Sequence, residues 1–399
     1  MIVAGEPSGD AHAAALVNAL RKKAPPKQSS EAQSSEAEFE FFGATGPLMR
    51  AEGVETVVNS DELAIMGILE VARALPKFLD AFRTLKQAAL ERSPDAVVLV
   101  DWPEFNLRLA TALHRRGLKI IYYISPQLWA WRPRRIGTIQ RDVDLLLSIL
   151  PFEAEWFKAR GVEHVQFVGH PLAGEVRARF GREEFCRRHN LNASQPIVSL
   201  LPGSRRKELQ RILPPMLAAV AKLNAVRPEI QCVVVVAPSR TIEETKQIVT
   251  QQNGAGSIGL ASIKLVRGET REALAASDAA AVASGTATLE AALLETPMVV
   301  VYKESAVNWH TLGRLITVSH YGLVNLVAGK EIARELMQND LTAESLAQEL
   351  LKLLDPAANR IARQQLAEVA HRLGEGGASE RAAELISDFL NQRAAVQAF

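Results

Sequence analysis

Short, nearly continuous apolar runs alternate with helical stretches along most of this chain, and this alternation constrains its fold more than any other feature. In the first half the runs cover residues 2–4, 39–42, 96–100 and 119–124. A second series covers residues 197–201, 232–237, 263–266, 279–283 and 298–302. Strands that are apolar on both faces are typical of a parallel sheet with helices on both sides. The pattern therefore predicts an α/β protein with two doubly wound, Rossmann-like domains.

The length of 399 residues suits two domains better than one core. We assign residues 1–172 to an N-terminal domain and residues 173–345 to a C-terminal domain. The carboxyl ends of their strands are expected to face across a cleft, where ligands of such sheets usually bind. Residues 346–399 are expected to form helices that either pack back on the first domain or engage a partner chain. The Ser- and Glu-rich residues 28–38 are typical of a surface insertion.

Charge and cysteine content exclude several classes of protein. The 46 Lys and Arg residues nearly balance the 45 Asp and Glu residues, so the net charge of +1 gives no reason to expect a nucleic-acid partner. The two cysteines, Cys186 and Cys232, lie far apart and lack metal-ligand spacing. No signal peptide precedes the first strand, and no apolar stretch reaches the roughly 20 residues of a membrane span. We therefore expect a cytoplasmic protein that does not cross a membrane.

Residues 63–85 mix apolar side chains with Arg73, Lys77 and Arg83 in an amphipathic pattern. Such an element either lies in a lipid interface or packs inward as an ordinary core helix. Pro76 is expected to kink or restart the helix. The candidate membrane or acyl contacts are Met66, Ile68, Leu69, Leu75 and Phe78.

Residues 283–290, Ala-Ser-Gly-Thr-Ala-Thr-Leu-Glu, form the local segment that says most about function. They predict a strand end, a tight glycine turn and a helix start, which leave backbone N–H groups at the carboxyl edge of a parallel sheet. A phosphate binds such a turn, unless the turn is purely structural. Glu290 lies about one helical turn beyond Thr286, where its carboxylate would accept hydrogen bonds from a ribose diol. The candidate phosphate contacts are Ser284, Gly285, Thr286, Ala287 and Thr288.

A second candidate phosphate loop covers residues 201–208, after the apolar run 197–201. Gly203 and Ser204 would bring backbone donors to an anion, and Arg205 offers a planar guanidinium fork for phosphate oxygens. The alternative is a solvated basic helix start. Two such loops in one half of the chain favour a nucleotide diphosphate, which the second domain would hold.

Asp101 is the best candidate for a general base in the first domain. It directly follows four apolar strand residues, which places its carboxylate at the rim of the sheet, and partial burial would raise its basicity. The alternative is a structural cap on the loop that leads to Asn106. Glu104 lies in the same loop but does not adjoin the strand.

Four other residues near strand ends are weaker candidates for binding the acceptor or the sugar. Glu6 is a candidate for orienting a substrate. Ser8 and Gly9 would either receive an acceptor phosphate or cap the first helix. His170, at the expected domain junction, would either bind the donor phosphate or bond a backbone carbonyl.

Asp142 and Asp144 resemble an acidic triplet that holds a divalent metal in some glycosyltransferases. They open the apolar run 145–150 and have no further oxygen ligands nearby in the sequence. We therefore assign them to a strand start and expect no metal.

Six motifs in a fixed order make the chain resemble the lipid-A-disaccharide synthase family from residue 1 to about residue 340. They are Ala-Gly-Glu-Pro-Ser-Gly-Asp (4–10), Met-Gly-Ile-Leu-Glu-Val (66–71), Asp-Trp-Pro-Glu-Phe-Asn (101–106), Ser-Pro-Gln-Leu-Trp-Ala-Trp (125–131), Leu-Pro-Gly-Ser-Arg (201–205) and Ala-Ser-Gly-Thr-Ala-Thr-Leu-Glu (283–290). The chain departs from the family pattern at 28–38 and at 321–329, although Asn325 is retained.

The resemblance implies an inverting glycosyltransferase of the GT-B architecture that needs no metal or other cofactor. It implies transfer of 2,3-diacylglucosamine from its UDP derivative to 2,3-diacylglucosamine 1-phosphate, which yields a β(1→6) disaccharide and UDP. By resemblance, Asp101 would deprotonate the acceptor 6-hydroxyl, and Glu290 would bind the ribose. Arg205, Asn325 and the 284–288 turn would steady the leaving diphosphate.

The resemblance also bears on partners and location. Acylated substrates imply contact with the cytoplasmic face of the inner membrane, which favours the interfacial interpretation of the amphipathic element. The family exchanges C-terminal segments between subunits, which leaves a homodimer open. Two other functions stay open from the residues: a UDP-N-acetylglucosamine 2-epimerase, with acid and base groups at sugar C2, and a noncatalytic nucleotide-sugar-binding protein.

Overall fold

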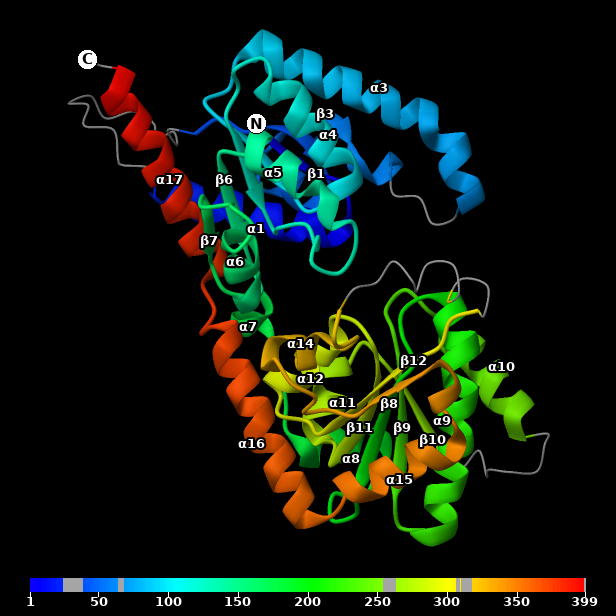
Figure 1. Cartoon of the computed structure of the whole chain (residues 1–399). Coiled ribbons are helices and arrows are strands. Elements are labelled where there is room, and N and C mark those ends of the chain that lie inside the picture. Colours follow the sequence, from blue (N-terminus) through cyan, green and yellow to red (C-terminus); the bar gives the residue numbers. More distant parts are fainter. Residues whose placement is uncertain (24–38, 64–67, 254–262, 306–308, 310–317, 398–399) are drawn as a thin grey trace, which may run out of the picture. The chain divides into compact units, whose positions relative to one another are not determined.

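The computed structural model describes residues 1–23, 39–63, 68–253, 263–305, 309 and 318–397. The chain divides into two compact units (Figure 1). The first comprises residues 1–171 and 376–399, and the second comprises residues 172–375. The Ser- and Glu-rich segment 28–38 lies outside the described residues.

The first unit is built on a parallel sheet, whose described strands follow the order β3-β2-β1-β4-β5-β6-β7. The strands are β1 (Ile2–Ala4), β2 (Phe42–Thr45), β3 (Glu55–Asn59), β4 (Val97–Val100), β5 (Ile120–Tyr123), β6 (Leu145–Ser148) and β7 (Val165–Phe167). The helices are α1 (Pro7–Lys23), α2 (Pro47–Ala51), α3 (Ile68–Arg92), α4 (Pro103–His114), α5 (Ile136–Asp142), α6 (Pro151–Lys158) and α17 (Ala378–Gln397), with short 3-10 turns η1 (Ser60–Glu62) and η2 (Pro133–Arg135). Strands β1, β4, β5 and β6 are buried along their whole length, as their apolar runs predicted.

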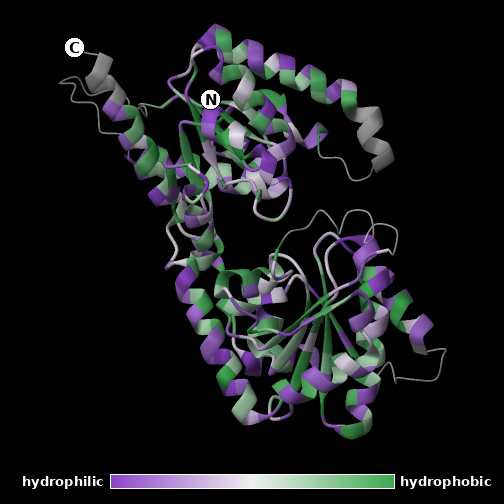
Figure 2. Ribbon diagram, viewed as in Figure 1, coloured by the Kyte–Doolittle hydropathy of each residue, from purple (hydrophilic) through white to green (hydrophobic). Residues whose placement is uncertain are grey.

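The second unit contains a parallel sheet with the order β10-β9-β8-β11-β12-β13 among its described strands. These are β8 (Ile197–Leu201), β9 (Gln231–Val236), β10 (Ile263–Arg267), β11 (Ala279–Ala283), β12 (Met298–Tyr302) and β13 (Glu335–Met337). The helices are α7 (Leu172–Glu175), α8 (Arg182–His189), α9 (Arg206–Val226), α10 (Ile242–Asn253), α11 (Thr270–Ala276), α12 (Ala287–Leu293), α14 (Leu323–Ala328), α15 (Ala343–Leu353) and α16 (Pro356–Leu373), with the 3-10 turn η5 (Gln338–Asp340). Figure 2 shows apolar residues concentrated along the strands and mixed with polar ones along the helices.

The predicted fold class is confirmed, since both units are α/β with a doubly wound parallel sheet. The C-terminal helices are divided between the units: α15 and α16 belong to the second, whereas α17 belongs to the first. There α17 packs against α1 (Figure 1). Ala382, Ala383 and Ile386 of α17 are buried in one cluster with Leu16 and Leu20 of α1.

The structure differs from the sequence pattern at two places, the restart of a helix at Pro76 and the bounds of β2. Helix α3 continues through Pro76 instead of restarting there, because Ala81, Leu85 and Ala89 on its later turns are buried in the core and stabilise one continuous helix. Strand β2 begins at Phe42, at the end of the apolar run 39–42. The earlier aromatic residues of that run, Phe39 and Phe41, pack instead against the cluster that joins α1 and α17.

Candidate active site

The backbone of Asp101 is held at three points immediately after β4. Its N–H donates to the Tyr123 carbonyl (3.0 Å), and its carbonyl accepts from Asn106 Nδ2 (2.9 Å) and from the Tyr122 hydroxyl (2.6 Å). Asp101 and Trp102 both adopt left-handed backbone conformations, with φ of 49° and 51°. The N-cap of α4 is Trp102, and no side-chain hydrogen bond caps that helix. The Asp101 carboxylate nevertheless accepts from the Trp102 backbone N–H, so a structural role at the start of the loop that leads to Asn106 stands beside the catalytic one.

The Asp101 carboxylate has the basicity that a general base needs. Burial raises the pKa of Asp101 to about 6, the negative charge of Glu6 acts in the same direction, and the backbone N–H of Trp102 opposes both. With that pKa, roughly nine in ten molecules carry the ionised carboxylate at pH 7. A base poised near the working pH combines the correct protonation state with a useful driving force for proton transfer.

An aromatic cluster holds the loop that carries Asp101. The Trp102 ring stacks on Phe105 at a centroid distance of 4.1 Å and an angle of 9°, and the Phe78 ring of α3 lies 6.0 Å away. The Trp102 ring also lies directly against Gly5, because a Cβ added at Gly5 would lie 2.1 Å from Trp102 Cδ2. Gly5 belongs to the sequence motif 4–10 and Phe105 to the motif 101–106. Trp102 contacts both residues and so joins the two motifs, which the sequence pattern does not predict.

Glu6, just before α1, and Ser8 and Gly9 in its first turn lie at the carboxyl end of β1. Glu6 acts electrostatically on Asp101, so these two carboxylates share one edge of the sheet. Asp10 in the same turn is buried and accepts from the N–H groups of Gly46, Leu48 and Met49 at 2.8 to 3.1 Å. Asp10 is therefore a structural anchor for α2, a role that the sequence analysis missed.

His170 is buried at the end of the first unit. Burial lowers the pKa of His170 to about 4, and the neighbouring His12 acts in the same direction. The imidazole is therefore neutral near pH 7, and it would contact a phosphate as a neutral donor only.

Asp142 and Asp144 are both engaged by cations of the first unit. Asp142 accepts from Arg141 and from the Thr111 hydroxyl, and Asp144 accepts from Lys119 Nζ at 2.6 Å. Asp144 also accepts from the Ile120 N–H, which ties it to the start of β5 and β6. Among the described residues, no group of three His, Cys, Asp or Glu side chains is arranged to hold a metal ion.

In the second unit, Glu208 occupies the backbone donors of the loop after β8. Its Oε2 accepts from the N–H groups of Ser204 and Arg205 (3.1 Å each), and its Oε1 accepts from Arg205 Nη1 (3.1 Å). Gly203 has φ of 106°, and a Cβ there would lie 2.5 Å from Glu208 Oε2. The sequence pattern predicts that these donors bind an anion directly. In this structure a carboxylate already binds them, so an incoming phosphate would have to displace Glu208.

In the turn between β11 and α12, the hydroxyl groups of Ser284 and Thr288 both donate to backbone carbonyls of the protein. Ser284 Oγ donates to the Tyr321 carbonyl (2.8 Å), and Thr288 Oγ1 donates to the Gly285 carbonyl (2.8 Å). These bonds fix the turn, whose Thr286 side chain is exposed and whose Gly285 has φ of 145°. The backbone of 285–287 is thus the part of the turn that suits an anion.

Glu290 and Arg271 lie side by side at the same end of the second sheet. Their Oε1 and Nε atoms are 3.4 Å apart, and Arg271 Nη1 donates to the Glu175 carbonyl at 2.7 Å. The carboxylate expected to bind a ribose therefore has a cationic neighbour in the first turn of α11, which the sequence pattern does not indicate.

Asn325 is fully buried and its amide is saturated by its own unit. Nδ2 donates to the Ala333 carbonyl (2.7 Å) and to Glu335 Oε1 (2.9 Å), while Oδ1 accepts from the N–H groups of Ile332 and Ala333 (2.9 Å each). Glu335 in turn accepts from the Tyr321 and Gly322 N–H groups. Asn325 therefore shapes the corner between α14 and β13, and its expected contact with a diphosphate stays a prediction.

The amphipathic element forms α3, and its described side chains point in two directions. Leu75 and Leu79 are 53% and 47% exposed. Phe78 and Phe82 instead contact Trp102 and Phe105. Of the candidate membrane contacts, Met66 and the side chains of Ile68 and Leu69 lie outside the described residues. Among the described helices, none combines the length and apolar composition of a membrane span.

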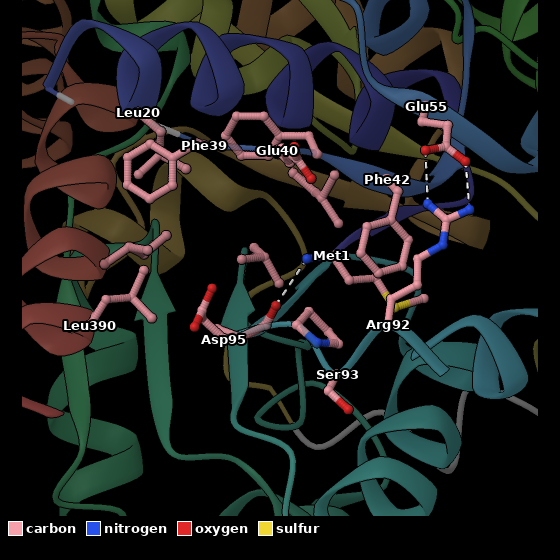
Figure 3. Close-up of a pocket in the computed structure, with 16 residues that line it drawn as sticks. Met1, Leu20, Phe39, Glu40, Phe42, Glu55, Arg92, Ser93, Asp95 and Leu390 are labelled. Atoms are coloured by element: carbon pink, nitrogen blue, oxygen red, sulfur yellow. Dashed lines mark hydrogen bonds and ion pairs between the residues drawn. The ribbon is translucent and has the colours of Figure 1, made fainter. Parts of the chain in front are cut away.

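A cavity of about 590 Å³ lies in the first unit, beside Met1, Phe42 and Arg92 (Figure 3). Figure 3 shows Arg92 paired with Glu55 on one side and Leu20, Phe39 and Leu390 on the other. Its lining includes the amino ends of β1, β2 and β4, which lie at the opposite edge of the sheet from Asp101, together with residues of α1, α3 and α17. Because ligands of parallel sheets bind at the carboxyl ends, this cavity is not the candidate active site.

The sequence matches proteins of one family over nearly its whole length. The profile of the lipid-A-disaccharide synthetase family matches residues 1–389. The lipid-A-disaccharide synthase of Myxococcus xanthus (strain DK1622) is 42% identical over 391 residues, which cover 98% of this chain and 97% of the relative. The enzyme of the same name from Solibacter usitatus (strain Ellin6076) is 41% identical over 392 residues, with the same coverage.

Solved structures with the same fold are much more distant in sequence. The glycotransferase of kitacinnamycin aligns with a TM-score of 0.61 at 16% identity, over 97% of each chain. The UDP-GlcNAc 2-epimerase from Neisseria meningitidis, bound to UDP-GlcNAc, aligns with a TM-score of 0.58 at 9% identity, over 95% of this chain and 97% of its own. At such identities the likeness concerns the fold alone, and it supports the GT-B architecture. By its sequence, the chain belongs to the lipid-A-disaccharide synthase family of glycosyltransferases.

Proposed function

We propose that the chain transfers 2,3-diacylglucosamine from UDP-2,3-diacylglucosamine to the 6-hydroxyl of 2,3-diacylglucosamine 1-phosphate, which yields the β(1→6) lipid A disaccharide 1-phosphate and UDP. The observation that carries the proposal is Asp101, a carboxylate at the carboxyl end of β4 with a fixed backbone and a pKa of about 6. Family membership supports the two substrates. Neighbours of the same fold whose structures contain UDP or a UDP-sugar support a UDP-linked donor.

Asp101 acts as the general base in this reaction. As the acceptor oxygen attacks the anomeric carbon of the donor, its proton passes to the Asp101 carboxylate. The bond between that carbon and the diphosphate oxygen breaks, and its electron pair leaves with UDP. Attack opposite the leaving group inverts the configuration, which gives the β linkage.

The second unit binds the UDP part of the donor. The 285–287 backbone receives the diphosphate, and Arg205 adds a guanidinium that balances the charge developing on the leaving group. This requires Arg205 to leave Glu208, an exchange that its exposed side chain permits. Glu290 accepts hydrogen bonds from the ribose hydroxyls. Asn325 holds Glu335, which fixes the backbone of Tyr321 and Gly322 next to the Ser284 end of the turn.

The first unit meets the acylated substrates at a membrane surface. Leu75 and Leu79 are large apolar side chains exposed on a helix that also carries Lys77 and Arg83. Such a face suits the boundary between headgroups and acyl chains of anionic lipids. We infer that the chain associates peripherally with the cytoplasmic face of the inner membrane. The proposal includes a homodimer.

A direct assay tests the function. The purified chain is incubated with both acylated substrates in detergent micelles containing EDTA, and disaccharide formation is followed by mass spectrometry. We expect disaccharide and UDP in equal amounts, with Asp101→Asn still binding UDP but at least about a hundredfold slower in turnover. Epimerisation of UDP-N-acetylglucosamine without disaccharide would overturn the proposal in favour of the epimerase alternative. UDP-sugar binding without turnover of either kind would favour the noncatalytic alternative.

A further inference from the structure

Three arginine side chains surround one carboxylate next to the Asp101 loop. Glu104 Oε1 accepts from Arg132 Nη1 (2.7 Å) and Arg135 Nη1 (2.8 Å), and Glu104 Oε2 accepts from Arg135 Nη2 (2.7 Å). The positive charge of Arg108, one turn further along α4, also helps to lower the pKa of this carboxylate. We call Glu104, Arg108, Arg132 and Arg135 the arginine cluster.

The arginine cluster keeps a surplus of positive charge. Three guanidinium groups face one carboxylate, so two positive charges are left over (3 − 1 = 2). Burial alone would raise the pKa of Glu104, but the guanidinium groups of Arg135, Arg132 and Arg108 lower it below its usual value. Glu104 therefore stays ionised and orders the arginines without neutralising them.

The arginine cluster is open to solvent and lies beside a flat aromatic surface. The side chains of Arg132 and Glu104 are each 46% exposed, and that of Arg135 is 27% exposed. The guanidinium of Arg132 lies 4.3 Å from the ring centroid of Trp131, which is itself 38% exposed. An indole next to a guanidinium offers a sugar ring an apolar face and a charged anchor together.

The arginine cluster and Asp101 belong to the same edge of the first sheet. Glu104 lies three residues after Asp101, and Arg132 and Arg135 follow β5, the strand that pairs with β4. The Tyr122 hydroxyl donates to the Asp101 carbonyl and lies within electrostatic range of Arg135 and Glu104. Burial is the main cause of the raised pKa of Tyr122. The negative charges of Asp101 and Glu104 raise this pKa further, and the positive charge of Arg135 opposes them.

We propose that the arginine cluster binds the phosphate monoester of the acceptor sugar while Asp101 holds the hydroxyl that reacts. This inference rests on the proposed function. In the acceptor, the reacting hydroxyl on C6 and the phosphate on C1 lie at opposite ends of one sugar. When Asp101 binds the hydroxyl, the phosphate therefore needs an anion site about one sugar ring away from Asp101. The arginine cluster supplies an anion site on the same edge of the sheet as Asp101.

The chemistry of the arginine cluster suits a phosphate better than a carboxylate. A phosphate monoester carries about −1.5 to −2 charges at pH 7 and three acceptor oxygens, whereas Glu104 carries one charge. Planar guanidinium groups bind such oxygens in pairs. The phosphate therefore competes successfully with Glu104 for Arg132 and Arg135, and the surplus charge of the arginine cluster is neutralised only when the acceptor is bound.

A lipid headgroup phosphate offers the same chemistry, so the experiment separates the two sources. Arg132→Gln and Arg135→Gln are compared with wild type and with Arg116→Gln, an exposed arginine in the turn after α4, at that helix's other end. Each protein is assayed in uncharged detergent micelles with the acceptor 1-phosphate and with the same acceptor bearing a free 1-hydroxyl. Binding to vesicles of anionic or zwitterionic phospholipid is measured by sedimentation.

We expect Arg132→Gln and Arg135→Gln each to raise the KM for the phosphorylated acceptor about tenfold, the typical effect of one lost charge-assisted hydrogen bond. The kcat, the KM for the UDP-linked donor and the kcat/KM for the dephosphorylated acceptor should change little, and Arg116→Gln should match wild type. Equal losses with both acceptors would overturn the proposal. Loss of anionic-vesicle binding with unchanged acceptor kinetics would assign the arginine cluster to headgroups instead. If wild type forms no disaccharide, the proposed function itself has failed, which is a separate outcome.

Discussion

Replacing Asp101 by Asn should slow catalysis at least about a hundredfold and at the same time stabilise the protein. Burial raises the pKa of this carboxyl from 3.8 to about 6. Because the folded-state pKa lies above the unfolded value, the folded state holds the proton more strongly, and stability is lost as pH rises from about 3.8 through 6. Each pKa unit corresponds to about 1.4 kcal/mol, so the ionised carboxylate costs the folded state up to about 3 kcal/mol at pH 8.

Asn has nearly the same shape and carries no charge at any pH, so the variant avoids this cost. The gain in unfolding free energy should reach up to about 3 kcal/mol at pH 8, about half of that at pH 5, and vanish near pH 3. Urea unfolding followed by tryptophan fluorescence suits the measurement. Four of the five tryptophans, namely Trp102, Trp129, Trp131 and Trp156, belong to the first unit, so the signal reports mainly on the unit that contains Asp101.

The kinetic part of this prediction uses the same pKa. In wild type, kcat/KM should fall about tenfold for each pH unit below an apparent pKa of about 6. Glu6→Gln should move that acid limb to lower pH, because the negative charge of Glu6 helps to raise the pKa of Asp101. The reasoning is refuted if Asp101→Asn is no more stable than wild type at pH 8, or gains equally at all pH values. Undiminished turnover of Asp101→Asn would refute the role as a base.

Three further variants test other parts of the structure. Gly5→Ala places a Cβ 2.1 Å from Trp102 Cδ2, so the indole must move by about 1 Å and kcat should fall about a hundredfold, while UDP binding measured by calorimetry stays unchanged. A Leu75→Ser, Leu79→Ser double variant should sediment less with anionic vesicles at an unchanged melting temperature, and unfolding would instead show a core role. Asn325→Ala leaves the N–H groups of Ile332 and Ala333 unpaired and should lower the free energy of unfolding by about 2 to 4 kcal/mol, measured by chemical denaturation. Lost activity at full stability would instead point to direct contact with the diphosphate.

Patterns of consecutive residues were sufficient to locate most strands and the candidate base. The runs 197–201, 279–283 and 298–302 coincide with β8, β11 and β12, because a strand buried on both faces leaves a continuous apolar signature. Asp101 stood out for the same reason, as the first charged residue after such a run. The path of α3 through Pro76 was not predictable in this way, since it depends on how later turns of the helix pack.

The sequence by itself determined the two α/β units, the family and the residue types available at each strand end. Only the tertiary structure decided which of those residues meet. Glu208 takes the N–H groups that the sequence offered to a phosphate, and Asn325 is saturated by neighbours seven to ten residues away. Glu104 and Arg135 are 31 residues apart yet form a bidentate pair. Local patterns set backbone conformation through short-range sterics and side-chain burial, whereas pairing, displacement and pKa depend on charges and donors that packing brings together from distant parts of the chain.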